Sequence, residues 1–270
     1  SGNADFNGDL DVDGTTNLDV VDVDGAVNFA ADVTFADGAD IITASAGTSN
    51  VRVGVNAGNS IASGGNYNVA VGDEAGTAIT TGDNNVVIGY AAGAAITTGL
   101  KNIFIGSNTG DAVTTANENV AVGHFVMSNN VLGAKNTAVG TSTLSALNPA
   151  TATDMYNVAV GFQAGNAVTT GGDNTIVGGL AADALTTGFN NTAMGRNALS
   201  TEDTGRYNVA IGMNALKDQN ADVDNYNTAV GYAAGGDVTT GIRNTLIGAL
   251  AGDALTDADY NVAVGMQALS

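Results

Sequence analysis

The sequence predicts an all-β protein, a β-solenoid of about thirteen coils with a period of about 17 residues. Thirteen times an Asn is followed four residues later by a Gly, with an apolar residue directly before the Gly. Nine of the twelve intervals between these Asn residues are 17 residues long, and the others are 18, 21 and 19. A fixed period of this kind indicates stacked repeats that each contact their neighbours. The repeated residues are Asn50, Asn68, Asn85, Asn102, Asn119, Asn136, Asn157, Asn174, Asn191, Asn208, Asn227, Asn244 and Asn261.

Composition restricts the classes of function. Seven Lys and Arg against 27 Asp and Glu give a formal charge of −20, which disfavours binding to nucleic acid or to an anionic membrane. The chain has no Cys, so disulfides and thiolate sites are excluded. One Pro and 38 Gly suit tight turns between short strands. No apolar run approaches the ~18 residues of a membrane span, so we expect no membrane insertion.

Residues 1–49 lack the Asn-to-Gly pattern and form a separate acidic segment. Apolar and acidic residues alternate in 10–13 and 21–24, and each run is followed by a Gly. This pattern predicts short strands separated by Asp-Gly turns. We therefore divide the chain into a β-strand shaft or attachment segment, 1–49, and a β-solenoid repeat domain, 50–270.

Each repeat begins with a strand of the type Val69-Ala70-Val71. The first and third positions share one face, which we expect to line the coil interior. The middle position is also apolar, except at Arg52, and a strand that is apolar on both faces is buried on both. We expect its outer face to be covered by identical chains around a symmetry axis, which predicts a homo-oligomer; the family resemblance given below implies a homotrimer. The trimer-axis candidates are Ala70, Val87, Phe104, Ala121, Ala138, Ala159, Ile176, Ala193, Ala210, Ala229, Leu246 and Ala263.

The second half of many repeats carries a run such as Ala78-Ile79-Thr80-Thr81-Gly82. Its β-branched residues predict a second short strand, with one Thr of each pair facing solvent. The extra residues of the three longer intervals should form outward loops near 60–65, around Pro149 and near 219–224.

The repeated Asn is expected to form a hydrogen-bonded ladder of stacked amides, and the repeated Gly to adopt a positive φ. No catalytic, cofactor or metal site is predicted. His124, the only His, lacks partners for a metal cluster or a triad, so we expect it to be a local packing variation. Asp clusters such as Asp9, Asp11 and Asp13, or Asp222 and Asp224, could bind Ca²⁺ but are expected to be solvated turns.

A column of Tyr residues precedes the repeated Asn, and we expect it to pack between neighbouring coils, with sugar stacking as the alternative. Its members are Tyr67, Tyr156, Tyr207, Tyr226 and Tyr260. The Thr pairs give a different hypothesis, ice binding, which needs a regular Thr array. The row of Thr pairs along the repeats is interrupted, for example by Val131-Leu132 and Asn148-Pro149, which disfavours ice binding.

The pattern N-[VT]-A-[VI]-G-x-x-A-[LG], as in 191–200, resembles the repeats that precede intramolecular chaperone domains in bacteriophage tail fibre and tailspike-like proteins. It is also similar to the head repeats of trimeric autotransporter adhesins, whose coils are shorter. Residues 1–49, with Gly8-Asp9-Leu10-Asp11-Val12-Asp13-Gly14, are similar to phage fibre shaft segments.

The resemblance implies a non-enzymatic structural or adhesive fibre of a virion. Its expected partners are copies of itself, other tail proteins and a host surface receptor. A bacterial surface trimeric adhesin is the alternative, and an ice-binding solenoid is the third hypothesis. In the resembling phage proteins a carboxy-terminal chaperone cuts itself off at a Ser, so Ser270 is a candidate processing end.

Overall fold

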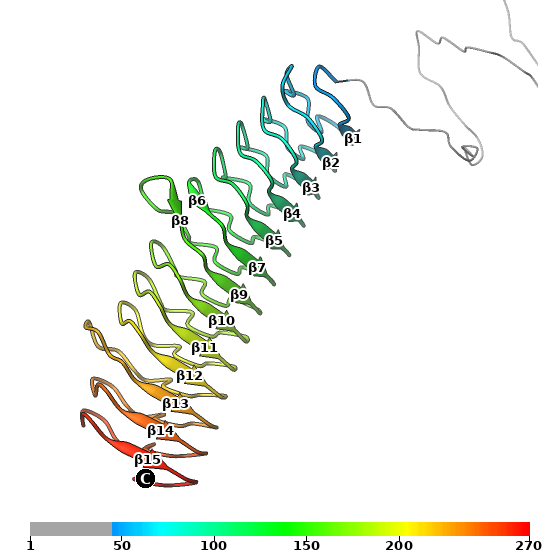
Figure 1. Cartoon of the computed structure of the whole chain (residues 1–270). Coiled ribbons are helices and arrows are strands. Elements are labelled where there is room, and N and C mark those ends of the chain that lie inside the picture. Colours follow the sequence, from blue (N-terminus) through cyan, green and yellow to red (C-terminus); the bar gives the residue numbers. More distant parts are fainter. Residues whose placement is uncertain (1–44) are drawn as a thin grey trace, which may run out of the picture. The chain divides into compact units, whose positions relative to one another are not determined.

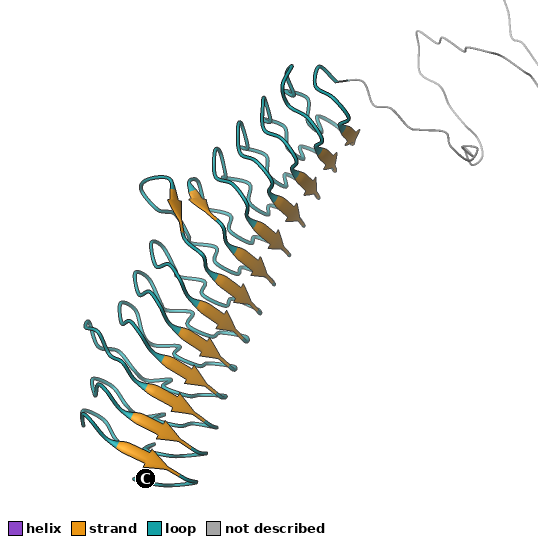
Figure 2. Cartoon of the chain, viewed as in Figure 1, coloured by secondary structure: helices purple, strands orange, loops and turns teal. Residues whose placement is uncertain are grey.

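A computed structural model describes residues 45–270, which form a parallel β-solenoid and contain no helix (Figures 1 and 2). Within this range there is accordingly no helix long and apolar enough to span a membrane. Residues 1–44 lie outside this description. The shaft segment predicted for 1–49 therefore lies outside the described residues, except for 45–49. The predicted fold class, an all-β solenoid of about thirteen coils, is confirmed.

Each coil contributes one three-residue strand to a 13-stranded parallel sheet. Neighbouring strands pair in register, so that Ala70 of one coil lies beside Val87 of the next. The strands are β1 (Val51–Val53), β2 (Val69–Val71), β3 (Val86–Ile88), β4 (Ile103–Ile105), β5 (Val120–Val122), β7 (Thr137–Val139), β9 (Val158–Val160), β10 (Thr175–Val177), β11 (Thr192–Met194), β12 (Val209–Ile211), β13 (Thr228–Val230), β14 (Thr245–Ile247) and β15 (Val262–Val264).

The longest coil carries a small second sheet. Strand β6 (Gly133–Ala134) pairs with β8 (Thr153–Asp154), and the loop that leads into β8 protrudes from the stack (Figure 1). Exposed residues also occupy the other two predicted loop regions, at Ser63 and Gly64 and at Asp222 and Val223. The extra residues thus leave the register of the main sheet unchanged.

The predicted second strand of each coil does not form. No strand is assigned to the segments 78–82, 95–99, 112–115, 167–171, 184–188 and 237–241. Backbone hydrogen bonds still join these segments between coils, as in Thr80 N–H to the Thr97 carbonyl at 2.9 Å. Several positions in each coil take a left-handed φ, so the chain turns too often for a second run of extended residues.

The prediction of which strand face lies inside is wrong. The middle residue of the strand points into the coil interior of its own chain, and its two neighbours point outward. The trimer-axis candidates are therefore core residues, at most 2% exposed within one chain, and cannot contact a second one. These residues are Ala70, Val87, Phe104, Ala121, Ala138, Ala159, Ile176, Ala193, Ala210, Ala229, Leu246 and Ala263.

The expected Asn ladder is present along the whole stack. The side-chain oxygen of Asn157 accepts the backbone N–H of Asn174 at 3.1 Å, and the oxygen of Asn174 accepts that of Asn191 at 2.9 Å. The Asn174 amide also donates to the Gly188 carbonyl across its own coil at 2.9 Å. One side chain thus joins two successive coils and closes its own, while lying fully buried.

The Gly that ends each strand is required by both conformation and space. Gly72 has a φ of 129° and Gly89 a φ of 130°, values that side chains rarely adopt. A Cβ placed on Gly72 would lie 2.6 Å from the carbonyl oxygen of Gly89 in the next coil. These Gly residues therefore allow the coils to stack at strand spacing.

Large and small residues alternate across the narrow interior. Phe104 in β4 faces Gly110, where an added Cβ would lie 2.6 Å from the Phe104 ring. In another coil the corresponding residues are Ala138 and Leu144, both fully buried. These two coils thus place their large side chain at different positions of the interior.

We predict that Asn174→Ala lowers the free energy of unfolding by roughly 1–3 kcal/mol, because the Asn191 N–H and the Gly188 carbonyl lose buried partners. Denaturant unfolding measures the change. Asn220→Ala, at an exposed position, is the control and should change stability by less than about 0.5 kcal/mol. Equal effects of the two substitutions would show that the ladder contributes nothing.

We predict that Phe104→Ala lowers the free energy of unfolding by roughly 3–5 kcal/mol through a core cavity. Gly110→Leu alone should also destabilise, because its side chain meets the Phe104 ring. The double variant reproduces the Ala138 and Leu144 arrangement and should recover more than half of the summed loss. Additive destabilisation in a double-mutant cycle would contradict this account of the core.

Candidate functional site

The outer face of the 13-stranded sheet is a continuous apolar surface, which we call the outer sheet face. It consists of the first and third residues of every strand in that sheet. All of these are Val, Ile, Met or Thr, and none is charged. Several are more than a third exposed, among them Ile103 at 37%, Val160 at 38% and Ile247 at 40%. Exposed β-branched residues in unbroken rows are unusual for a surface that stays in water.

Further exposed apolar side chains follow the Gly at the end of the strands. Tyr90 is 56% exposed, Phe162 57% and Tyr232 50%. They lie directly after the strands of the outer sheet face in the chain, so they widen its apolar margin. His124 occupies the same position in its repeat, with its ring 4.1 Å from that of Phe125.

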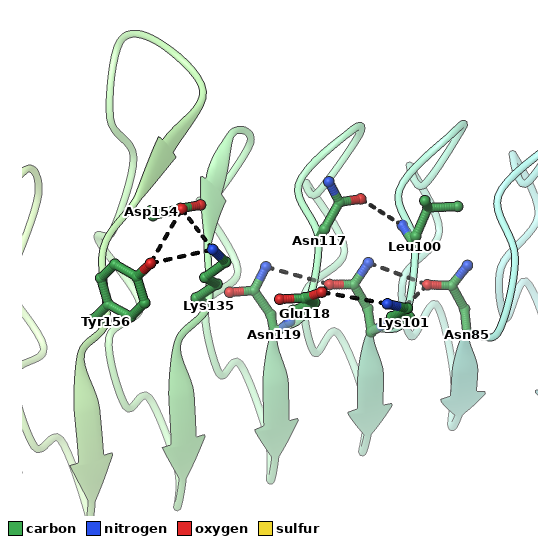
Figure 3. Close-up of polar contacts among 10 residues, drawn as sticks. Asn85, Leu100, Lys101, Asn117, Glu118, Asn119, Lys135, Asp154 and Tyr156 are labelled. Carbon is green, nitrogen blue, oxygen red and sulfur yellow. Dashed lines mark hydrogen bonds and ion pairs between the residues drawn. The ribbon is translucent and has the colours of Figure 1, made fainter.

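The edge that precedes the strands is polar and carries most of the cations in 45–270. In Figure 3, Lys101 pairs with Glu118 at 3.5 Å beside the buried Asn ladder. One coil further on, the Lys135 ammonium donates to Asp154 at 2.7 Å and to the Tyr156 hydroxyl at 3.2 Å. The hydrogen bond with Asp154 raises the pKa of Lys135 and, in return, lowers the pKa of Asp154. These pairs are solvent-exposed, so they hold the coils in register only weakly.

Towards the carboxyl end, the same edge becomes a ladder of aromatic rings and Arg residues. The Tyr207 and Tyr226 rings stack with centroids 4.8 Å apart and planes 3° from parallel. Arg206 lies 4.5 Å from the Phe189 ring centroid, and Arg243 lies 5.2 Å from that of Tyr260. The Tyr column thus packs between coils at this end, as predicted, and Phe189 and the two Arg residues extend it. The sequence pattern that defines the column, a Tyr directly before the repeated Asn, does not include Phe189, Arg206 or Arg243.

The remaining predicted candidates lie apart from one another. Asp222 accepts the Thr204 hydroxyl at 2.8 Å, and Asp224 pairs with Arg206 at 3.5 Å. No group of three His, Cys, Asp or Glu side chains suited to a metal ion occurs in 45–270. Asp9, Asp11 and Asp13 precede the described residues. The exposed Ser270 donates its hydroxyl to the Gln267 carbonyl at 2.9 Å.

The Thr pairs divide their roles as expected. The second residue of the pairs is exposed, as at Thr81 and Thr187, while the first is partly buried at Thr80 and Thr186. The Thr80 hydroxyl donates to the Thr97 carbonyl of the next coil at 3.0 Å. One hydroxyl of this pair is thus used in coil-to-coil bonding.

One buried acid was missed in the sequence. Glu202 is fully buried, although in most coils its position is occupied by Ile, Val or Leu. Burial raises the pKa of its carboxyl group to about 7. The sequence signal for Glu202 is a polar residue at a repeat position that is apolar in most coils. The sequence pattern places this position in a second strand, which does not form.

No protein-family model, curated protein or solved structure matches this chain. The function is therefore inferred from the sequence pattern and from the geometry and surfaces of the solenoid.

We predict a favourable coupling of roughly 0.5–1.5 kcal/mol between Tyr207 and Tyr226 in a double-mutant cycle with Ala, because the rings stack. Denaturant unfolding of the two single variants and the double variant gives this energy. Tyr156 and Tyr226 belong to edge positions four coils apart and form the control pair, which should be additive. Coupling of equal size in both pairs would indicate a general effect on the stack.

Proposed function

We propose that this chain is a non-enzymatic structural and adhesive fibre component of a virion, most consistent with a phage tail fibre. In this proposal three copies assemble side by side through the outer sheet face. The charge-free surface of that face, which is apolar at the third position of every strand, carries the proposal. The number three and the virion setting come from the sequence resemblance to phage fibres and trimeric adhesin heads.

The distribution of charge supports burial of the outer sheet face. The chain carries a formal charge of −20, yet no Asp, Glu, Lys or Arg occupies an outward strand position in the 13-stranded sheet. Burying a charge against another chain is costly, so an assembly surface is depleted of charge. In 45–270 the acidic residues other than the buried Glu202 lie on turns and edges instead.

The dimensions of the face suit association with a second copy. Thirteen strands at ~4.8 Å spacing and three residues of width give roughly 60 by 10 Å, or about 600 Å² per chain. The exposed Tyr90, Phe162 and Tyr232 add to this area. Stable interfaces bury about 800 Å² per partner, a similar amount. A second copy also has the same repeat, so its rows of side chains can match along the whole length.

We predict that the protein is a trimer in solution and that Val160→Asp, Ile211→Asp and Ile247→Asp together convert it into folded monomers. The three carboxylates would otherwise be buried without partners between chains. Sedimentation and circular dichroism measure the assembly and the fold. The matched control, Thr170→Asp, Thr187→Asp and Thr240→Asp, adds the same charge on exposed turns and should remain trimeric.

A wild-type protein that is monomeric at micromolar concentration would contradict the proposed assembly. A trimer that persists in the variant with Asp at 160, 211 and 247 would contradict it as well. Ala121→Asp provides a further contrast. Because Ala121 is fully buried inside its own coil, this substitution should unfold the coil rather than dissociate intact chains.

We predict that antibodies raised against 45–270 label tail fibres of virions in immunoelectron microscopy. Labelling of a bacterial surface in the absence of virions would instead favour the adhesin. This test addresses location alone, so its result is independent of the oligomer measurement.

A further inference from the structure

Glu202 replaces an apolar residue inside the solenoid. It lies eleven residues after Asn191, and the same position in other coils is occupied by Ile79, Ile96 and Leu185, all fully buried. Glu202 is itself 0% exposed. In the next coil this position holds Gln219, which is uncharged, so neither neighbour in the column offers a cation.

The contacts of Glu202 satisfy hydrogen bonding without neutralising charge. Its Oε1 accepts the Gly205 N–H at 2.7 Å, and its Oε2 accepts the Asn225 Nδ2 at 3.2 Å. Backbone N–H groups of Ala221 and Thr204 also favour the charged form, but burial outweighs these hydrogen bonds and raises the pKa. Asp203, the next residue, adds a like charge. Arg206 is the cation on this turn, and it pairs with Asp224 rather than with Glu202.

The turn needs an acceptor but not a charge. In an earlier coil Asn130 occupies the same position, and its Oδ1 accepts the Gly133 N–H at 2.8 Å. This contact corresponds to that between Glu202 and Gly205. Asn130 is also fully buried, so a neutral side chain performs the same capping role.

The coil that follows Glu202 is irregular. It contains two residues more than the 17-residue period, within 208–227. Its ladder residue, Asn208, is fully buried, and its Nδ2 makes no hydrogen bond within the described part of the chain. Asp222 and Asp224 in the insertion contact Thr204 and Arg206 of the Glu202 turn. Asn225 and these two surface contacts thus connect the Glu202 turn to the insertion.

We propose that the turn 202–206 and the insertion 219–225 form a pH-responsive junction, which opens locally when Glu202 loses its proton while the neighbouring coils stay stacked. An ionised carboxylate at this position has no cation to offset its burial, so opening towards water relieves the cost. The proposal is independent of the virion setting and of the trimer.

The direction of the pH effect follows from linkage. The pKa of Glu202 is about 7 in the folded chain, above the ordinary value of 4.5. A raised pKa means that the carboxyl group stabilises the closed state below about pH 4.5 and that this contribution is lost as the pH rises to about 7. Closure of the junction should therefore be strongest in acid and should reach a constant lower level above neutrality.

Hydrogen–deuterium exchange of the intact protein between pH 5 and 8 tests the proposal, after correction for the intrinsic pH dependence of exchange. The amides of Gly205 and Asn225 should lose protection by roughly ten- to a hundredfold over this range. The Gly133 amide, capped by the neutral Asn130, is the control within the same molecule and should show no such loss.

Glu202→Gln keeps the cap and removes the titration, so its protection at Gly205 should not vary with pH. Glu202→Leu reproduces the residue at position 185 and should likewise lose the pH dependence, which keeps the test decisive if one variant folds poorly. An unchanged pH profile in both variants, or a flat profile in the wild type, would overturn the proposal.

Discussion

The Asn ladder is the constraint on which the rest of the solenoid depends. Each ladder side chain in 45–270 is buried or nearly so, and a buried amide without partners is costly. In regular coils the amide reaches a carbonyl 14 residues further along, as Asn68 does at Gly82. That contact fixes the length of each coil. The side-chain oxygen of the same Asn accepts the N–H of the next ladder Asn and so joins the coil to the following one. Where the coil is longer the contact changes: the Asn136 amide turns to the Ala134 carbonyl, and Asn208 Nδ2 is left without a partner.

A closed coil with one strand has a narrow interior, and this decides which face of the strand is buried. Ala at the middle position fits inside with the backbone turns, whereas larger middle residues such as Phe104 require Gly110 opposite. The branched residues on either side then face outward. The exposed apolar sheet is therefore a consequence of tight turns, and it creates the surface for which we propose a partner.

In 45–270, the apolar residue eleven positions after the ladder Asn is replaced by a polar one only beside or within the two longest coils. Asn130 precedes the 21-residue coil, and Glu202 and Gln219 lie at the 19-residue coil. Asn130 and Glu202 each accept a turn N–H that a carbonyl of the next coil accepts in regular coils, as at Gly82. Gln219 instead donates its side-chain amide to the Thr239 carbonyl. Variation is tolerated because each coil contacts only its neighbours, so a local defect does not propagate along the stack.

The amino-acid sequence by itself determined the fold class, the period, the ladder of Asn residues and the positions of the loops. It did so because these features repeat, and a repeat is visible without knowledge of the third dimension. Thr at the first strand position, as in Thr137, Thr175 and Thr192, was a sign that this face lies outside the coil. The sign was not decisive, because three apolar residues in succession have no periodicity that separates inside from outside.

Only the tertiary structure decided the direction of the strand faces, the absence of a second strand and the place of Phe189, Arg206 and Arg243 in the aromatic edge. These depend on the width of the coil and on left-handed turn residues such as Lys101 and Tyr226, whose conformation is not evident from residue type. Glu202 depends on the same information, since its burial is known only once its column is placed inside the coil. The interior volume and the turn geometry of the closed coil therefore determined these features, which the sequence pattern did not decide.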